Sequence, residues 1–316
     1  MHVADSLLTP AVGAALWVAS AAVLGWSSRR VRHADQDHIV PLMGVLGAFV
    51  FAAQMINFTI PLTGSSGHIG GGLLLSILLG PHAAFLVIAS VLTVQALVFA
   101  DGGVLALGAN LFNLGAFPCF VGYLLVYHPM IGNAPLQATR LRMVGGIVLA
   151  CVVGLQLGAL GVVLETTLSG ISDLPMAVFL LLMQPIHLAI GLVEGAATAA
   201  VVLFLRRERP DIFLRETTSS ASSGEASGRS IRPLLVRLGL ASALFAGVLS
   251  WFASPQPDGL EWSLAHAGTH QTEPTPEKVW PAVDETESVA GLLGAGTTLC
   301  LVVGVAWLLR RRRPTL

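Results

Sequence analysis

Residues 7–26 read LLTPAVGAALWVASAAVLGW, an apolar run that is long enough to cross a bilayer as one helix. Arg29, Arg30 and Arg32 follow the run, and no positive charge precedes it. A secretory signal would carry its charge before the apolar core. The positive-inside rule instead places the N-terminus outside the cell and the arginine-bearing loop inside. The stretch therefore predicts a first membrane span.

The composition of the whole chain agrees with a membrane protein. Of its 316 residues, 54% are hydrophobic and only 11% are charged, whereas a soluble domain has roughly 25% charged residues. The only lysine is Lys278, so the chain has no G-x-x-x-x-G-K-[ST] phosphate-binding loop. If ATP powers this protein, another polypeptide must hydrolyse it.

The apolar runs and the arginines together predict seven spans before residue 206. With this arrangement, all sixteen arginines of the chain fall on the inner side. Residues 71–100 are too long for one ordinary span, and Gly80-Pro81 is expected to break them into two short helices. The other predicted spans are residues 7–26, 39–60, 104–127, 143–164 and 175–205.

We expect an all-α, polytopic membrane protein in three parts. The first module is a seven-span bundle (residues 1–205), and residues 206–232 form a flexible inner linker rich in Ser and Gly. The second module (residues 233–316) has two spans, residues 233–253 and 289–309, joined by an outer loop. The C-terminus then lies in the cytoplasm.

The start of the chain carries the strongest metal-binding pattern. The α-amine of Met1, the amide of His2 and the His2 imidazole lie within chelating reach of one ion, and such flat nitrogen coordination favours Ni²⁺ or Cu²⁺. Bulky His2 is expected to prevent removal of Met1. His68, in a glycine-rich loop on the same outer side, would complete a four-nitrogen plane. The alternative is two unrelated surface histidines.

Several sequence blocks resemble one family of metal importers. MHVADSLL, residues 1–8, resembles the start of the CbiM/NikM family, the substrate-capture components of energy-coupling-factor cobalt and nickel importers. Residues 51–58, 64–68, 79–81 and 101–103 look like further blocks of that family. PDGLE, residues 257–261, is similar to the signature of the companion CbiN/NikN family. Ala4, Ser6 and Leu7 depart from the usual Pro, Gly and Phe, but no expected metal ligand is lost.

The resemblance implies that Met1, His2 and His68 bind the transported metal, and that no cofactor is needed. It also implies a subunit of the bacterial inner membrane that captures nickel or cobalt, and the planar nitrogen set favours Ni²⁺, with Co²⁺ next. Its partners would be a transmembrane coupling (T) subunit and ATPase (A) subunits. Because the ligands must be unprotonated, binding should weaken in acid. The companion's outer loop is a candidate for opening the entrance.

Other polar residues are weaker candidates. His187 and Glu194 share a helix face within a predicted span, where a structural network is favoured over metal binding. His266 and His270 are interpreted as incidental loop histidines, and residues 33–38 as a solvated charged turn. Some of five span residues are expected to orient the metal-binding imidazoles: Gln54, Asn57, Gln95, Asn110 and Asn113.

Two other functions stay open at this stage. A secondary metal permease would import metal with this chain alone and without ATP. A membrane sensor or assembly factor is disfavoured, because the chain has no appended soluble domain to pass on a signal. Ala11, Ala15 and Ala19 form a stripe of small residues that would suit close contact with a partner helix or with lipid.

Overall fold

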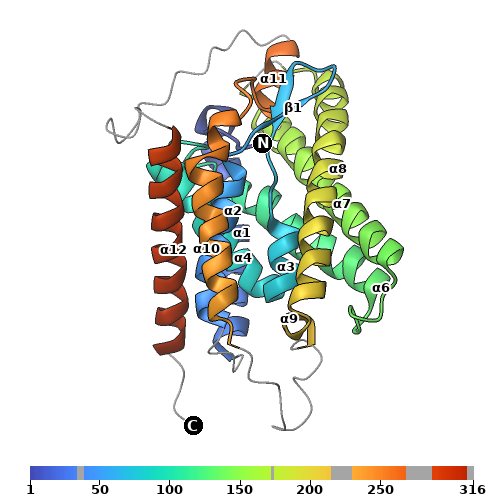
Figure 1. The fold of residues 1–316 in the computed structure, drawn as a ribbon. Helices are drawn as coiled ribbons and strands as arrows, with labels where there is room; N and C mark the ends of the chain where they lie inside the picture. The colour runs from blue at the N-terminus through green and yellow to red at the C-terminus, as the bar shows by residue number, and fades with distance from the viewer. Residues whose placement is uncertain (34–38, 172–173, 215–229, 268–286, 312–316) are drawn as a thin grey trace.

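The computed structural model describes residues 1–33, 39–171, 174–214, 230–267 and 287–311. Nearly all ordered segments in these ranges are helical, and Figure 1 shows most helices running roughly along one axis. The elements up to residue 214 are η1 (Asp5–Leu7), α1 (Pro10–His33), α2 (Ile39–Gln54), β1 (Phe58–Ile60), β2 (Ser65–Gly67), α3 (Gly72–Leu79), α4 (Pro81–Val98), α5 (Leu107–Asn110), η2 (Leu111–Tyr127), α6 (His128–Ile131), α7 (Arg140–Ser169), α8 (Met176–Glu208) and α9 (Asp211–Leu214). Those after residue 229 are α10 (Arg232–Gly247), η3 (Leu249–Phe252), α11 (Gly259–His266) and α12 (Glu287–Arg311).

Six helical segments of the described chain are long and apolar enough to cross a membrane: residues 10–33, 81–98, 107–131, 140–169, 176–208 and 289–309. α2 is apolar but shorter, with 16 residues, and α3 has only 8. The all-α prediction is therefore confirmed, and the seven-plus-two count of crossings stays a prediction. The one sheet in the described ranges is the antiparallel hairpin β1–β2, which pairs Phe58 with Gly67.

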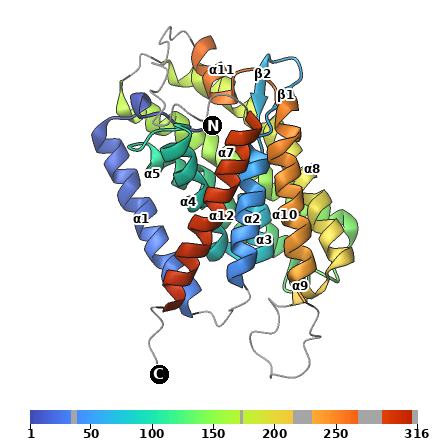
Figure 2. The same ribbon diagram turned by 60° about the vertical axis from the view of Figure 1, so that its left-hand side comes forward.

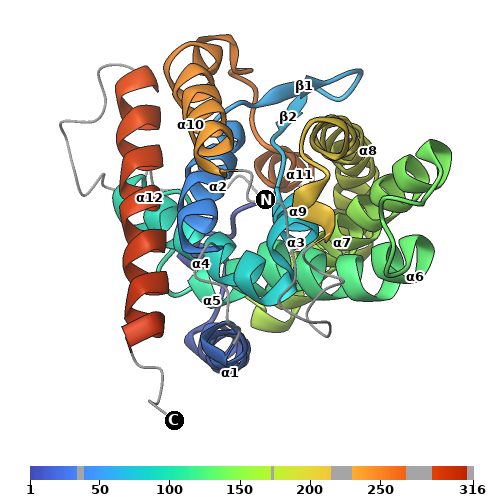
Figure 3. The same ribbon diagram turned by 60° about the horizontal axis from the view of Figure 1, so that its bottom comes forward.

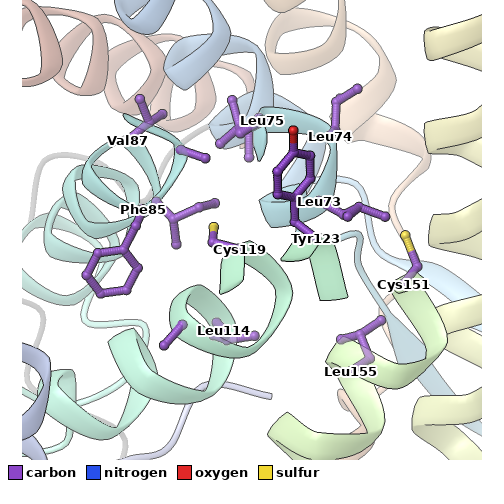
Figure 4. Close-up of a cluster of buried hydrophobic side chains, with 14 of the residues drawn as sticks. Leu73, Leu74, Leu75, Phe85, Val87, Leu114, Cys119, Tyr123, Cys151 and Leu155 are labelled. Carbon is purple, nitrogen blue, oxygen red and sulfur yellow. The ribbon is translucent and has the colours of Figure 1, made fainter. Parts of the chain in front are cut away.

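The predicted break in residues 71–100 falls between α3 and α4. Gly80 adopts a φ of 78°, which ends α3, and Pro81 then starts α4 at the first helical position, where its missing N–H costs nothing. α3 and α4 pack against η2, and Figure 4 shows the apolar side chains that fill this region together with α7. These include Leu73, Leu74, Leu75, Phe85, Val87, Leu114, Cys119, Tyr123, Cys151 and Leu155.

The start of the predicted linker is helical. α8 runs to Glu208, and the short helix α9 follows after Arg209 and Pro210. Arg206 donates a hydrogen bond of 2.6 Å to the carbonyl oxygen of Leu136, which ties the end of α8 to the loop before α7. The predicted flexible character of residues 215–229 lies outside the described residues.

The second module packs against the first along α2. α10 and α12 both contact α2, and Figures 1 and 2 show the three helices side by side. At Gly44 of α2, a Cβ atom would lie 2.6 Å from Cγ2 of Val303 in α12, so the glycine permits this close contact.

α1 lies at one side of the bundle in Figure 2, where it contacts α4, α5 and η2. Two of the three alanines of its predicted stripe, Ala11 and Ala15, are exposed, and Ala19 is half-buried.

Candidate metal site

The first residues of the chain run into the bundle, close to α11 and the β hairpin, as Figures 1 and 3 show. Val3 is fully buried. Its N–H donates to Oδ1 of Asn110 at 2.7 Å, and its carbonyl accepts from Nδ2 of the same side chain at 3.1 Å. The amide of Gly103 donates to that carbonyl as well, at 3.2 Å. The Asn110 side chain thus provides hydrogen-bond partners for both buried backbone groups of Val3, as a neighbouring β-strand would.

The glycines of the Asp101-Gly102-Gly103 block make room for this segment. A Cβ at position 103 would overlap the side chain and backbone nitrogen of Asp5. Gly102 has a φ of +83°, and a Cβ there would lie 2.7 Å from Nδ2 of Asn110. The block therefore shapes the seat of the N-terminal residues, and this explains why it contains two glycines.

His2 and His68 lie side by side. Their ring centroids are 5.3 Å apart and the rings meet edge to face, at 65°. Nδ1 of His2 lies 2.7 Å from Oδ1 of Asp101. Because a carboxylate only accepts hydrogen bonds, this places the hydrogen of a neutral His2 on Nδ1. Nε2 of His2 is buried and has no hydrogen-bond partner among the described residues.

The surroundings of His68 favour the uncharged form of its imidazole. Burial, followed by the charges of the N-terminal ammonium and His2, lowers the pKa of His68 to about 4. Nδ1 of His68 is 3.1 Å from the carbonyl oxygen of Ile69 and acts as the donor, which leaves the Nε2 lone pair for another group. Burial alone would raise the pKa of Asp101, but His2 holds it below its ordinary value.

The loop that carries His68 is held from two other helices. Glu194 of α8 accepts from the amides of Gly70 and Gly71, both at 2.9 Å. Gln54 at the end of α2 donates to the carbonyl of Gly70 at 2.7 Å. These buried bonds fix the backbone directly after His68.

The α-amine of Met1 meets a residue from the other end of the chain. It forms an ion pair of 2.5 Å with Oδ2 of Asp258, the Asp of the PDGLE segment. Oδ1 of Asp258 caps α11, accepting from the amides of Leu260 and Glu261. Burial alone would raise the pKa of Asp258, but the ammonium and the hydrogen bond from the Glu261 amide hold it well below its usual range.

The PDGLE segment is docked on the hairpin of the first module. The amide of Ser66 donates to the carbonyl of Pro257 at 2.8 Å, and the Ser66 hydroxyl donates to the carbonyl of Gln256 at 2.7 Å. Further along, the amide of Ser254 donates to the carbonyl of Asn57 at 2.8 Å. Part of the predicted outer loop of the second module is thus an ordered cover beside the two histidines.

A polar cavity of about 380 Å³ opens beside His68 between the two modules. Three carboxylates line it, those of Asp101, Asp258 and Glu261. Its first-module wall also includes Gln54, Met55, Asn57, Gln95 and Phe99, and its second-module wall Ser250, Ala253, Ser254 and Gln256.

The weaker candidates among the sequence predictions differ in their surroundings. Glu194 is satisfied by backbone amides, as the interpretation of a structural network predicts, whereas Nε2 of His187 has no partner among the described residues. His266 donates from Nδ1 to the carbonyl of Trp262 and stacks on its ring. His270 and residues 34–38 lie outside the described residues.

Of the five polar span residues, Gln54 and Asn110 support the site through backbone contacts. Gln95 donates to Gln54 at 2.7 Å, and Asn113 donates to Glu165 at 2.8 Å. Within the described part of the chain, no hydrogen bond joins any of the five to the ring of His2 or His68. The orientation of His2 comes instead from Asp101, which follows a span.

Met1, His2 and His68 are therefore gathered in one place, together with Asp101 and Asp258. The sequence interpretation missed the roles of these two carboxylates, although both stand in quoted motifs. No group of three or more His, Cys, Asp or Glu side chains in the described ranges is arranged to hold a metal ion. A site here therefore needs the backbone nitrogens of the first two residues.

The chain is similar to known metal transport proteins. Residues 2–212 match the sequence profile of the family described as CbiM, "Cobalt uptake substrate-specific transmembrane region", and residues 232–285 match the PDGLE domain. A relative in Archaeoglobus fulgidus, named for fused nickel transport (NikMN), is 33% identical over 312 residues, covering 97% of each chain. "Cobalt transport protein CbiM" of Geobacter sulfurreducens is 31% identical over 260 residues, covering 78% of this chain and 72% of its own.

Two solved structures are similar as well. A crystal structure described as a transition metal transporter has a TM-score of 0.58 and 30% identity, and the match covers 69% of this chain and 98% of that one. A truncated transition metal transporter gives a TM-score of 0.57 and 32% identity, covering 66% of this chain and 99% of that one.

Proposed function

This chain belongs to the CbiM family and carries a PDGLE domain behind its CbiM region, and from this premise we propose that it captures Ni²⁺ for import, with Co²⁺ as the next choice. It is a transport protein rather than an enzyme, as the names of its relatives indicate. Its multi-pass helical fold is that of a membrane protein.

The observation that carries the proposal is the gathering of nitrogen donors at the N-terminus. The amine of Met1 and the rings of His2 and His68 meet inside the bundle, and the two rings are 5.3 Å apart. The amine, the amide of His2 and its ring would form fused chelate rings on one ion, and His68 would supply the fourth nitrogen. A flat four-nitrogen set suits Ni²⁺ and Cu²⁺ better than Co²⁺, which is the reason for preferring nickel.

The two carboxylates give this set a stable metal-free form. Asp258 pairs with the Met1 ammonium, and Asp101 accepts from Nδ1 of His2. When an ion binds, the Met1 ammonium and the amide of His2 each lose a proton to solvent. The hydrogen on Nδ1 of His2 moves to Nε2, since a chelate ring with the amide closes through Nδ1. Both carboxylates then lie close to the ion and offset its charge.

The cavity between the modules is the proposed entrance. Its three carboxylates, Asp101, Asp258 and Glu261, attract cations to a space that borders His68. Asp258 also belongs to the cover that contacts Ser66. We propose that movement of the PDGLE segment away from the hairpin admits the ion and frees the Met1 amine in one step.

The source of energy is the second part of the proposal. Since the chain has no phosphate-binding loop, ATPase subunits and a transmembrane coupling subunit of energy-coupling-factor type would drive release into the cytoplasm. The competing function is a secondary permease that needs no ATP. Expression with and without such partners, followed by uptake of radioactive Ni²⁺ and Co²⁺, separates the two: a permease would import equally well alone.

The metal site is tested by lengthening the chain at its start. Four additional residues without histidine before Met1 move the free amine out of chelating reach of His2, so the fused chelate rings cannot form. We expect the amount of Ni²⁺ bound per purified chain to fall at least tenfold, measured by mass spectrometry of the metal. The same four residues added after Leu316 are the matched control. Unchanged Ni²⁺ binding by the lengthened chain would refute the proposed site.

A further inference from the structure

His187 of α8 is a buried histidine with one unused nitrogen. Its side chain is 1% exposed, and its Nδ1 lies 2.8 Å from the carbonyl oxygen of Met183. Since a carbonyl only accepts, the hydrogen is on Nδ1, and Nε2 carries a lone pair. That nitrogen has no hydrogen-bond partner among the described residues. A buried polar atom without a partner is costly and calls for an explanation.

The ring of His187 borders the proposed metal site. It lines a small cavity of about 10 Å³, whose walls also include Met1, His68 and Asp258. This volume has room for roughly one water-sized guest. The cavity therefore lies between His187 and two of the proposed nickel ligands.

The PDGLE segment closes this cavity beside the unused nitrogen. Gly259 is one of the lining residues, and a Cβ at this position would lie 3.7 Å from Nε2 of His187 and 2.6 Å from Cγ2 of Ile186. Only a glycine allows the backbone after Asp258 to approach α8 this closely. Nε2 consequently lies at the cavity, shielded from solvent.

A further metal ligand beside the planar four-nitrogen site would assist the release of the ion. A planar four-nitrogen complex holds its ion tightly, but its two faces stay open to a further donor. Ligand exchange in planar complexes proceeds through such a fifth donor. A neutral imidazole across a small cavity can therefore loosen an ion that the chelate would otherwise release slowly.

We propose that Nε2 of His187 coordinates the metal ion during its release, as the ion leaves Met1, His2 and His68. The inference rests on the proposed function. His187 is not part of the capture set, because the four nitrogens complete the plane without it. The described side chains also contain no preformed cluster of three His, Cys, Asp or Glu ligands. His187 acts only when the ion moves.

The test measures how fast bound nickel leaves. The purified full-length chain with an unmodified N-terminus is loaded with Ni²⁺ and mixed rapidly with excess chelator. The critical variant is His187→Asn. Its amide can still donate a hydrogen bond to the carbonyl of Met183, but it has no metal-coordinating atom at the position of Nε2. His187→Gln places an amide near that position instead. His82→Asn is the matched control, because His82 is a half-buried histidine of α4 that contacts Ser27.

We expect all variants to bind the same amount of Ni²⁺ with the absorption spectrum of the wild type. Release should be about tenfold slower in His187→Asn, intermediate in His187→Gln and unchanged in His82→Asn. Release from His187→Asn at the wild-type rate would overturn the inference and assign the cavity to a water molecule. Lost nickel or an altered spectrum in both His187 variants would also overturn it, since the residue would then serve capture. A wild-type chain that binds no Ni²⁺ would instead refute the proposed function.

Discussion

At the scale of single residues, the N-terminal segment is held by groups that do not touch a metal themselves. Asn110 binds both backbone groups of Val3, and Gly103 donates to the Val3 carbonyl. The carboxylate of Asp5 accepts from the amide of Ala106 at 2.8 Å. These contacts extend over the residues directly after His2, so they set the direction in which Met1 and His2 enter the bundle.

Gly103→Ala tests this seat. The added methyl group would overlap Asp5, and relieving the overlap must shift the N-terminal segment or the 101–103 loop. We expect a loss of about 1–3 kcal/mol in the free energy of unfolding, and weaker Ni²⁺ binding measured by calorimetry. Gly25→Ala in α1 is the control, because nothing lies within 4 Å of its added Cβ. Equal behaviour of the two variants would show that the seat tolerates movement.

The sequence predicted the closeness of His2 and His68 but not the acidic partners of Met1 and His2. Topology put His2 and His68 on one side of the membrane, and their rings are indeed close together. It did not find Asp101 as the partner of His2, or Asp258 as the partner of Met1. Both ion pairs depend on how distant segments return to the N-terminus, and no periodicity or spacing encodes that path. Whether Met1, His2 and His68 bind metal stays a prediction.

At the scale of secondary structure elements, α8 is the main support of the His68 loop. Glu194 accepts from two consecutive amides, those of Gly70 and Gly71, and uses both carboxylate oxygens. Gly71 has a φ of +77° and precedes α3, so the two bonds fix the turn between His68 and that helix.

Glu194→Gln tests this support. A glutamine can accept one of the two amide hydrogen bonds, but its NH₂ group would face the other donor. We expect Ni²⁺ affinity to fall about tenfold, or ~1.4 kcal/mol, in equilibrium dialysis of the purified protein. Glu165→Gln in α7 is the matched control, because Glu165 accepts from Asn113 through one oxygen, a role that glutamine can fill. A larger effect at position 165 than at position 194 would contradict this assignment.

Elements differ in how far the sequence determines them. Gly80-Pro81 marks the boundary of α3 and α4, because backbone geometry at these residue types is a local property. α11 was missed within the predicted outer loop. Its signal was nevertheless present, since Asp258 and Glu261 form a capping box in which each side chain binds the other residue's amide. The docking of that segment on Ser66 is a tertiary contact without a local signal.

At the scale of the whole molecule, the two modules share one helix interface and one site. α10 and α12 pack on α2, while the PDGLE segment reaches the hairpin and the Met1 amine. Because both modules belong to one chain, the PDGLE segment stays close to the candidate metal site, at an effective concentration on the order of mM.

Separating the modules tests this arrangement. Residues 1–212 and 232–316, produced together as two chains, should purify as a complex in detergent, because both interfaces persist. Gly44→Val should reduce the recovered second chain several-fold, since its side chain would collide with Val303. Gly239→Val in α10 serves as the control, as nothing lies within 4 Å of its Cβ. Full recovery with Gly44→Val would place the main interface elsewhere.

The ion pair between Met1 and Asp258 has a consequence for how the protein is made. Its two members are 257 residues apart, and ribosomes add about 5–20 residues per second, so Asp258 is synthesised roughly 10–50 s after Met1. From the synthesis of His68 until that of Asp258, the young polypeptide has its first amine and both imidazoles but not the PDGLE segment. Each copy therefore passes through an uncovered stage during its own translation, when a metal ion can reach the Met1 amine without displacing Asp258.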